Sequence, residues 1–139
     1  MAALQALVKK QIEMLNKGQV LEAFDLYFAE YGVMHSNGKL FGTGRAECRR
    51  KQEIFLENFC HVRGEISDLV IDEKSEFCVF RNTLAFERTT EKHHEINGLH
   101  VQMWAGGEIV IEWYFSGDLM EEVIAAGIFS DPAHILELV

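Results

Sequence analysis

The chain has 139 residues, and its 48% hydrophobic and 11% aromatic content is typical of a folded domain large enough to bury a core. Its 13 basic and 22 acidic residues give a formal net charge of -9, which disfavours nucleic acid as a partner because phosphate backbones repel such a surface. No apolar run approaches the roughly 20 residues of a membrane span, and Lys9, Lys10 and Glu13 stand where an export signal needs an apolar core. We therefore expect one cytoplasmic domain over residues 1–139 that binds neither nucleic acid nor membrane.

The cysteines and the His-rich segment predict neither a disulfide nor a metal site. Cys48, Cys60 and Cys78 are odd in number and lack Cys-x-x-Cys spacing, so neither a disulfide framework nor structural zinc is indicated. His93 and His94 lie in a polar stretch that a solvated loop explains. We expect free thiols, no metal and no cofactor.

Helical patterns come first along the chain. Apolar residues recur at helical spacing over residues 4–15, and Gly18 ends this helix. A second stripe over residues 20–31 predicts another helix, so the chain begins as a helical hairpin. The Asn-Gly pair at 37–38 predicts a tight turn between two short strands, and a third helix follows over residues 45–59.

Strand-like patterns dominate the second half. Residues 65–72 and 76–88 predict two strands, the polar stretch 89–95 predicts a loop, and residues 100–115 predict a hairpin around two glycines. Helices followed by an antiparallel meander indicate an α+β fold with helices on one face of a curved sheet. Such a cone, closed by the N-terminal helices, can hold a ligand.

The C-terminal tail, residues 119–139, is predicted to be helical. A helix covers residues 119–126, and a last turn begins where Ser130 or Asp131 caps and Pro132 takes the first helical position.

Two registers are possible for the predicted hairpin. A two-residue turn at Gly106-Gly107 would place His100 opposite Trp113 and mix polar with apolar residues on both faces. A three-residue loop over residues 105–107, with Gly107 in a left-handed bulge, would place His100 opposite Glu112.

The second register sorts the hairpin into two unlike faces. One face would be wholly apolar, comprising Leu99, Val101, Met103, Ile109, Ile111, Trp113 and Phe115. The other would carry Gly98, His100, Gln102, Trp104, Val110, Glu112 and Tyr114. We choose this register because a slip of one residue would expose the whole apolar set.

A carboxylate opposite an imidazole is a candidate catalytic pair. Glu112 would fix the tautomer of His100 and favour its charged form, which is how a general acid or base is oriented. Tyr114 and Gln102 would add hydrogen-bonding groups on the same face. From spacing alone, an exposed His–Glu pair on a solvated sheet face is the favoured explanation.

Three segments resemble the SnoaL-like branch of the nuclear transport factor 2-like superfamily, over about residues 8–118. They are "QIEMLNKGQVLEAFDLYFAEYG", "GTGRAE" and the closing "GGEIVIEWYF", where Trp104, Gly107, Ile109 and Trp113 match the family's hairpin. The resemblance implies that alternate hairpin residues line a cone and that the other face forms a homodimer. The implied interface comprises Val101, Met103, Ile111, Trp113 and Phe115.

The resemblance does not extend to the catalytic residues of well-known branches. Gln11, Ser36 and His100 stand where ketosteroid isomerases carry their catalytic groups. Arg88 matches an arginine of limonene-epoxide hydrolases, but Thr90 replaces the following aspartate. Neither steroid isomerisation nor epoxide hydrolysis is therefore expected.

Further ligand-binding candidates come from the alternation of side chains between the two faces of the predicted strands. His35 lies on the first strand and could reach the cone. Arg88 and Phe86 share the phase of Asn82, so an inward Arg88 would be a buried cation paired with Glu112 or with an anionic substrate. Gln102 and Trp104 complete the expected ligand-binding set.

Two functions fit the sequence. In the first, the cone binds a small, largely apolar organic molecule, and His100 transfers a proton while Tyr114 and Gln102 hydrogen-bond a carbonyl or hydroxyl. Isomerisation, dehydration or cyclisation would then proceed without a cofactor. In the second, the protein is a non-catalytic ligand-binding or dimerisation module.

Overall fold

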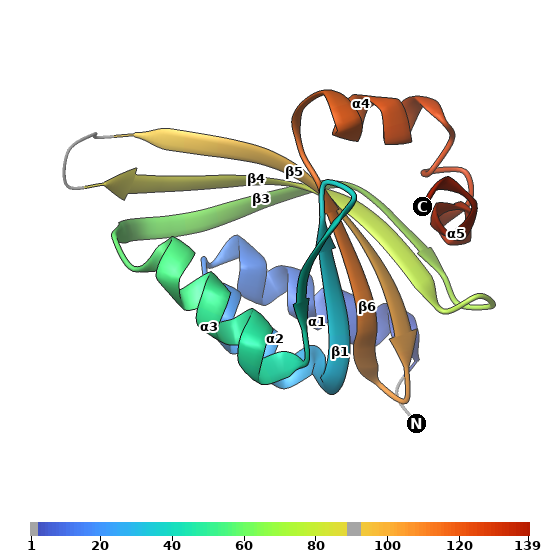
Figure 1. Ribbon diagram of the computed structural model, residues 1–139, viewed down its shortest axis with the longest axis horizontal. Coiled ribbons are helices and arrows are strands. Elements are labelled where there is room, and N and C mark those ends of the chain that lie inside the picture. The colour runs from blue at the N-terminus through green and yellow to red at the C-terminus, as the bar shows by residue number, and fades with distance from the viewer. Residues whose placement is uncertain (1–2, 89–92) are drawn as a thin grey trace.

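The computed structural model describes residues 3–88 and 93–139 as a curved six-stranded sheet with helices on both faces (Figure 1). The helices are α1 (Leu4–Asn16), α2 (Val20–Tyr27), α3 (Arg45–Leu56), α4 (Gly117–Ala125), the 3-10 turn η1 (Pro132–His134) and α5 (Ile135–Leu138). The strands are β1 (Phe28–Ser36), β2 (Lys39–Thr43), β3 (Phe59–Asp72), β4 (Phe77–Arg88), β5 (His94–Ala105) and β6 (Glu108–Phe115). Within the described residues, no helix is both long and apolar enough to cross a membrane.

The sheet is mixed, and with its helices it belongs to the predicted α+β class. Its strand order is β2-β1-β6-β5-β4-β3, and neighbours are antiparallel except for β1 and β6, which run parallel. Because β1 pairs with β6, the first and last strands in the sequence lie side by side in the sheet.

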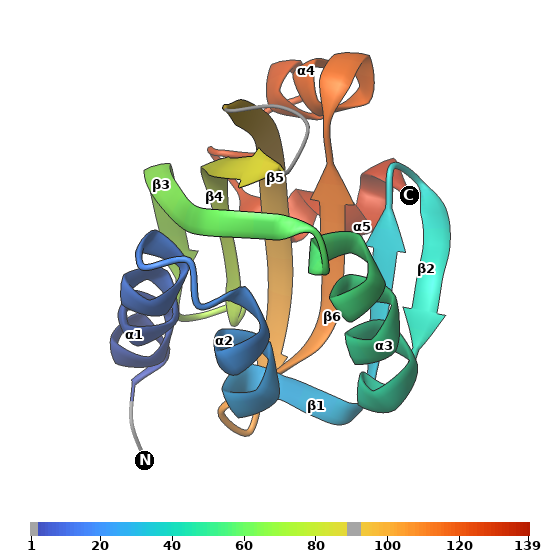
Figure 2. The same ribbon diagram turned by 90° about the vertical axis from the view of Figure 1, so that its left-hand side faces the viewer.

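The three N-terminal helices cover the inner, concave face of the sheet (Figure 2). The buried face of α1 carries Leu4, Val8, Gln11 and Leu15, at the spacing of one helical stripe. These residues pack with Phe24 and Phe28, whose rings stack at 4.5 Å, and with the inward residues of the sheet.

The C-terminal tail covers the outer face of the sheet, which corrects the expectation of helices on one face only. Met120, Val123, Ile128 and Ile135 pack on this face in a second core. The strand residues in that core are Phe77, Val79, Leu99, Val101, Trp113 and Phe115. A monomer therefore does not expose this apolar face, and the homodimer expected through it stays a prediction.

Two helix boundaries differ from the predicted ones. The second helix ends at Tyr27, because Phe28 already belongs to β1, which hydrogen-bonds to strands on both sides. The third helix ends at Leu56, and β3 begins at Phe59, whose ring stacks on Phe86 at 3.8 Å. Contacts with distant strands, which no local period reveals, decide both boundaries.

The hairpin combines a two-residue turn with a bulge, so the predicted register was wrong. Gly106 and Gly107 form the turn with φ of +60° and +82°, values that glycine adopts readily. The bulge comes at Val110, since Trp104 pairs with Ile109 but Met103 with Ile111. Beyond it the predicted faces hold, but each residue is paired two residues away from its expected partner, so His100 lies opposite Tyr114 and not Glu112.

Candidate functional site

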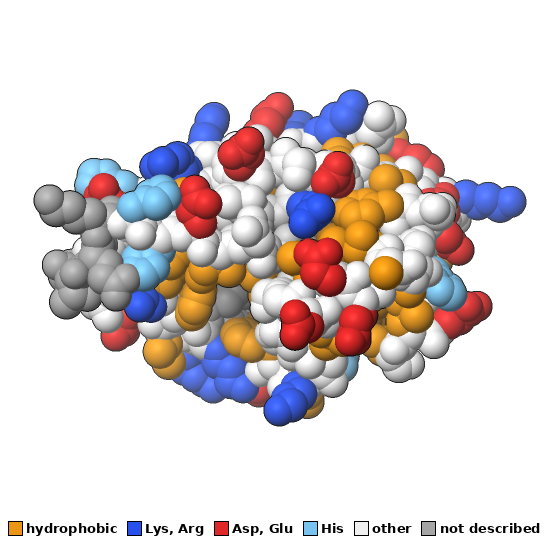
Figure 3. All heavy atoms as spheres, turned by 90° about the horizontal axis from the view of Figure 1, so that it is seen from above, with side chains coloured by type: hydrophobic (Ala, Val, Ile, Leu, Met, Phe, Trp, Pro, Cys, Tyr) orange, Lys and Arg blue, Asp and Glu red, His pale blue; other side chains and the backbone are white. Residues whose placement is uncertain are grey.

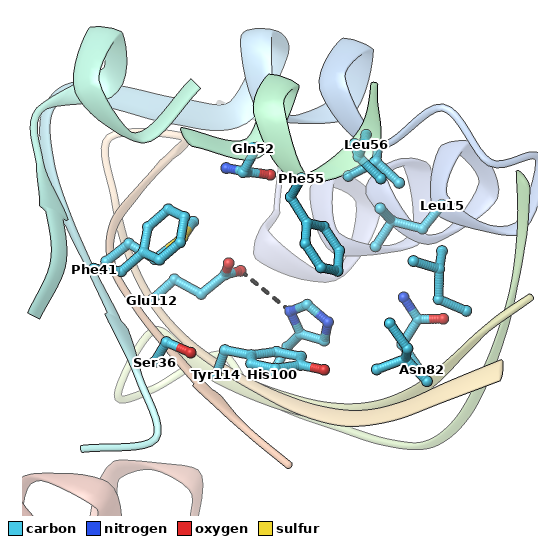
Figure 4. A pocket seen from close by; sticks show the side chains of 14 residues that line it. Leu15, Ser36, Phe41, Gln52, Phe55, Leu56, Asn82, His100, Glu112 and Tyr114 are labelled. Carbon is cyan, nitrogen blue, oxygen red and sulfur yellow. Dashed lines mark ion pairs between the residues drawn. The ribbon is translucent and has the colours of Figure 1, made fainter. Parts of the chain in front are cut away.

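A cavity of about 340 Å³ lies between the inner face of the sheet and the N-terminal helices (Figure 4). Its lining is mostly apolar. It comprises Leu15, Val20, Met34, Ser36, Phe41, Gln52, Phe55, Leu56, Asn82, Leu84, Ile96, His100, Glu112 and Tyr114. No lysine or arginine is found among these described lining residues. A cavity of this size and polarity suits a small organic ligand.

Side chains alternate between the two faces of β5 and β6, and this alternation places the polar groups of the cavity. His100 on β5 pairs with Tyr114 on β6, while Glu112 precedes Tyr114 by two residues on the same face of β6. The parallel neighbour β1 contributes Met34 opposite Glu112 and Ser36 opposite Tyr114. Three strands therefore supply one wall, and β1 is far in sequence from the β5–β6 hairpin.

His100 and Glu112 form the central pair of this wall. His100 Nδ1 lies 3.6 Å from a carboxylate oxygen of Glu112, and the two side chains are only 19% and 11% exposed. The imidazole stacks on Phe80 at 5.0 Å and meets the edge of Tyr114 at 5.1 Å. The carboxylate and the two rings hold the imidazole, and its far edge faces the cavity (Figure 4).

A buried amide network holds Glu112. Gln102, 1% exposed, donates through Nε2 to Glu112 Oε1 and to Gln11 Oε1, the latter at 2.8 Å. Its Oε1 accepts from Gln11 Nε2 at 3.0 Å, Trp104 Nε1 at 3.1 Å and Cys78 Sγ at 3.4 Å. Gln11 thus bonds to both ends of this amide, while Glu112 meets only its nitrogen and Trp104 and Cys78 meet only its oxygen.

The network determines which way the Gln102 amide points. An indole N–H can only donate, so the Gln102 oxygen must face Trp104 and its nitrogen must face Glu112. Glu112 Oε1 therefore accepts its hydrogen bond from the Gln102 amide nitrogen. We expected Gln102 and Trp104 to contact the ligand, but both lie outside the cavity lining and position Glu112 instead.

Tyr114 keeps its proton in this environment. Burial, with a smaller contribution from the charge of Glu112, raises the pKa of its hydroxyl. The ring lies against Gly98, where an added Cβ would come within 2.3 Å of it. Glycine at this position therefore makes room for Tyr114.

Three polar residues of the cavity, Ser36, Gln52 and Asn82, were not predicted from the sequence as ligand contacts. Asn82 Oδ1 and Gln52 Nε2 are buried without a hydrogen-bond partner in the described part of the chain. Asn82 interrupts the apolar phase of β4, and Gln52 follows Cys48 by one helical turn on the inner face of α3. A polar residue on an otherwise apolar face was the signal that could have found them.

Comparisons with known proteins bear on the fold. No family model and no curated protein matches the sequence. Among solved structures, a protein provisionally named a SnoaL-like polyketide cyclase from Mesorhizobium loti is 17% identical, with a TM-score of 0.67 over 82% of this chain and 98% of that one. AclR from Streptomyces galilaeus, provisionally named a hydroxylase, is 15% identical, with a TM-score of 0.69 over 91% of this chain and 97% of that one.

PrhC from Penicillium brasilianum is 19% identical, with a TM-score of 0.66 over 95% of this chain and 94% of that one. Each of these chains is matched over nearly its whole length. The protein has the nuclear transport factor 2-like fold. Identities this low establish the fold and no activity.

Other residues predicted from the sequence to bind the ligand lie outside the cavity. His35 points to the outer face, where its ring stacks with Trp113 at 6.3 Å, because it is Met34 and Ser36 that face inward. Arg88, expected as a buried cation, is exposed where β4 ends and lies over the rings of Phe59 and Phe86 at 5.1 and 5.9 Å.

Phe86 is buried, as its phase predicted, but it packs between Phe59 and His94 and does not line the cavity. The predicted loop 89–95 lies partly outside the described residues, and β5 already begins at His94.

Proposed function

We propose that the cavity binds a small, largely apolar organic molecule and that His100 transfers a proton to or from it, oriented by Glu112. The observation that carries this proposal is the acid–imidazole pair inside a mostly apolar cavity, with one edge of the ring facing the cavity where a ligand would bind. Names such as polyketide cyclase and hydroxylase among similar structures are compatible with such a ligand.

The proposed step needs no cofactor. With Nδ1–H directed at Glu112, the Nε2 lone pair of His100 accepts a proton from a carbon next to a substrate carbonyl. The C–H electron pair moves into an enolate, and its oxygen accepts a hydrogen bond from the protonated Tyr114 hydroxyl. Return of the proton to another carbon completes an isomerisation, in which no atom is gained or lost.

Proton exchange provides a test that needs no knowledge of the natural substrate. We would incubate the protein in D2O with β,γ-unsaturated cyclic ketones and follow the loss of the α-proton signal by NMR. The wild-type protein should accelerate exchange, and His100→Ala should remove at least about 100-fold of that acceleration, the usual contribution of a positioned general base. Glu112→Gln and Tyr114→Phe should each lower it by a smaller factor.

His35→Ala is the matched control, because His35 lies on the opposite face of the same sheet. It should leave the exchange rate unchanged. If His100→Ala exchanged as fast as the wild-type protein, the proposed mechanism would be wrong.

Binding without turnover is the second candidate, and one distance favours it. At 3.6 Å, His100 Nδ1 and Glu112 are too far apart for a hydrogen bond, so in this arrangement the carboxylate does not fix the tautomer. The pH dependence of ketone binding separates the two candidates. Binding that follows a histidine titration in the wild-type protein but not in His100→Ala supports the catalytic arrangement, whereas pH-independent binding supports a passive cavity.

A further inference from the structure

We propose that Cys60, His61 and Glu87 form a binding site for a zinc-like divalent cation on the outer face of the sheet. The sulfur, imidazole nitrogen and carboxylate oxygen of these residues all lie within 4.8 Å of one another. His61 Nε2 and Glu87 Oε2 are 3.4 Å apart, close to the spacing of two ligands that share one ion. The site lies outside the cavity lining and does not depend on the proposed function.

A bulge in β3 brings two neighbouring residues to the same carboxylate. Cys60 pairs with Glu87 and Arg63 pairs with Ala85, so His61 and Val62 lie opposite a single residue of β4. In a regular strand, the side chains of Cys60 and His61 would point to opposite faces. His61 instead has a φ of +52°, and both side chains reach Glu87.

The donor set determines the class of ion. One thiolate, one imidazole and one carboxylate are the ligands that Zn²⁺ takes, whereas Mg²⁺ and Ca²⁺ favour oxygen alone. Three protein ligands leave a fourth position for water or for another donor. Because the three ligand atoms lie within 4.8 Å of one another, the side chains have to close by less than about 1.5 Å to reach zinc distances. Side chains as exposed as those of Cys60 and His61 can do so.

The surroundings leave the site open to a cation. Cys60 and His61 are exposed, Glu95 adds a second carboxylate on the same face opposite Ala85, and Arg63, which also pairs with Ala85, adds one positive charge. The outer face at this end of β3, β4 and β5 extends beyond the cover of α4 (Figure 1), and histidine, acidic and basic side chains are exposed there (Figure 3). The chain's net charge of -9 adds a long-range attraction for cations.

The other two thiols do not compete for the ion. Cys48 and Cys78 are completely buried, and burial raises the pKa of Cys48 to about 11 and that of Cys78 to about 12. A metal–thiolate signal from the folded protein would therefore come from Cys60. This makes the site observable by spectroscopy.

The test is a titration of the purified, metal-free protein with Co²⁺ and Zn²⁺. Co²⁺ should bind with one equivalent and give a thiolate charge-transfer band, which Zn²⁺ then displaces. Calorimetry should show one equivalent of Zn²⁺, bound at least about tenfold more weakly in Cys60→Ser, His61→Ala and Glu87→Gln. The charge-transfer band should disappear in Cys60→Ser.

His134→Ala is the matched control, because His134 and Glu137 form another exposed His–Glu pair, at 2.9 Å, to which no cysteine is joined. It should bind Zn²⁺ as the wild-type protein does. Zn²⁺ binding that is unchanged in Cys60→Ser, or that is lost in His100→Ala, overturns the proposal, the second result because the ion would then sit in the cavity. Circular dichroism of every variant shows whether the fold is retained.

Discussion

The two faces of the β5–β6 hairpin are buried almost equally but are built differently. On the outer face, Val101 and Trp113 are packed by apolar groups of the C-terminal tail. On the inner face, Gln102 and Glu112 are just as inaccessible, yet their polar atoms require a hydrogen-bond network. Burial alone therefore does not distinguish a site from a core. The polar groups retained at a cost in desolvation mark the site.

The largest effect should come from a charge placed in the outer core. Val101 has no exposed surface, so Val101→Asp should lower the free energy of unfolding by more than about 3 kcal/mol, since the carboxylate finds no partner there. Chemical denaturation measures this free energy of unfolding. Asn97→Asp, on an exposed position of the same strand, should change it by less than about 0.5 kcal/mol. Equal effects would show that the tail does not seal this face.

The predicted homodimer is checked with the same variants. Its expected interface, which includes Val101 and Trp113, is covered by the tail, so association through it would require the tail to move. Native mass spectrometry of the wild-type protein and Asn97→Asp gives the oligomeric state directly. A dimer would have to use another surface or a displaced tail.

A smaller loss is expected when the inner network is broken. Gln102→Leu leaves the Trp104 N–H and the Gln11 amide without partners, which should cost about 2–3 kcal/mol in the free energy of unfolding. Gln52→Leu makes a sharp comparison, because Gln52 Nε2 has no partner to lose within the described residues. It should cost less than about 1 kcal/mol. A Gln102→Leu variant as stable as Gln52→Leu would mean that the network contributes nothing.

The buried thiols of the inner side predict alkaline destabilisation. Folding raises the pKa of Cys48 from 9.0 to about 11 and that of Cys78 from 9.0 to about 12, so the folded state retains protons that the unfolded state loses. Stability is therefore fully present below pH 9 and declines above it, by at most about 1.4 kcal/mol per pH unit for each thiol.

Denaturation curves from pH 8 to pH 10.5 measure this decline, and Cys78→Ala should reduce its slope. A chromogenic thiol reagent provides the control. In the native protein it should modify Cys60 alone, and in denaturant all three cysteines. Rapid native modification of Cys78 would contradict its burial.

The smallest effect concerns the cap of the tail. The Asp131 carboxylate accepts a hydrogen bond from the Ala133 N–H at 3.2 Å, so Asp131→Ala should cost about 0.5–1 kcal/mol in unfolding free energy. Ser130→Ala should cost nothing measurable, because the structure gives the capping role to Asp131. The reverse result would move the cap to Ser130.

Much of the architecture could be predicted from local patterns. The period of two along the hairpin separated Val101 and Trp113 from His100 and Glu112 correctly, although the turn was misjudged. The bulge at Val110 compensates for the two-residue turn and restores the predicted faces. The site was predicted in part: His100, Glu112 and Tyr114 line the cavity, whereas Gln102, Trp104, His35, Arg88 and Phe86 do not.

The amino-acid sequence by itself determined the helical stripes, the alternation of side chains along the strands and a helix cap directly before Pro132, because each depends on neighbours within a few residues. Tertiary structure alone decided where β1 and β3 begin, that the tail packs on the outer face, and that His61 turns toward Glu87. Each of these depends on contacts between segments far apart in sequence. Their free energy comes from packing and pairing partners that no local period encodes.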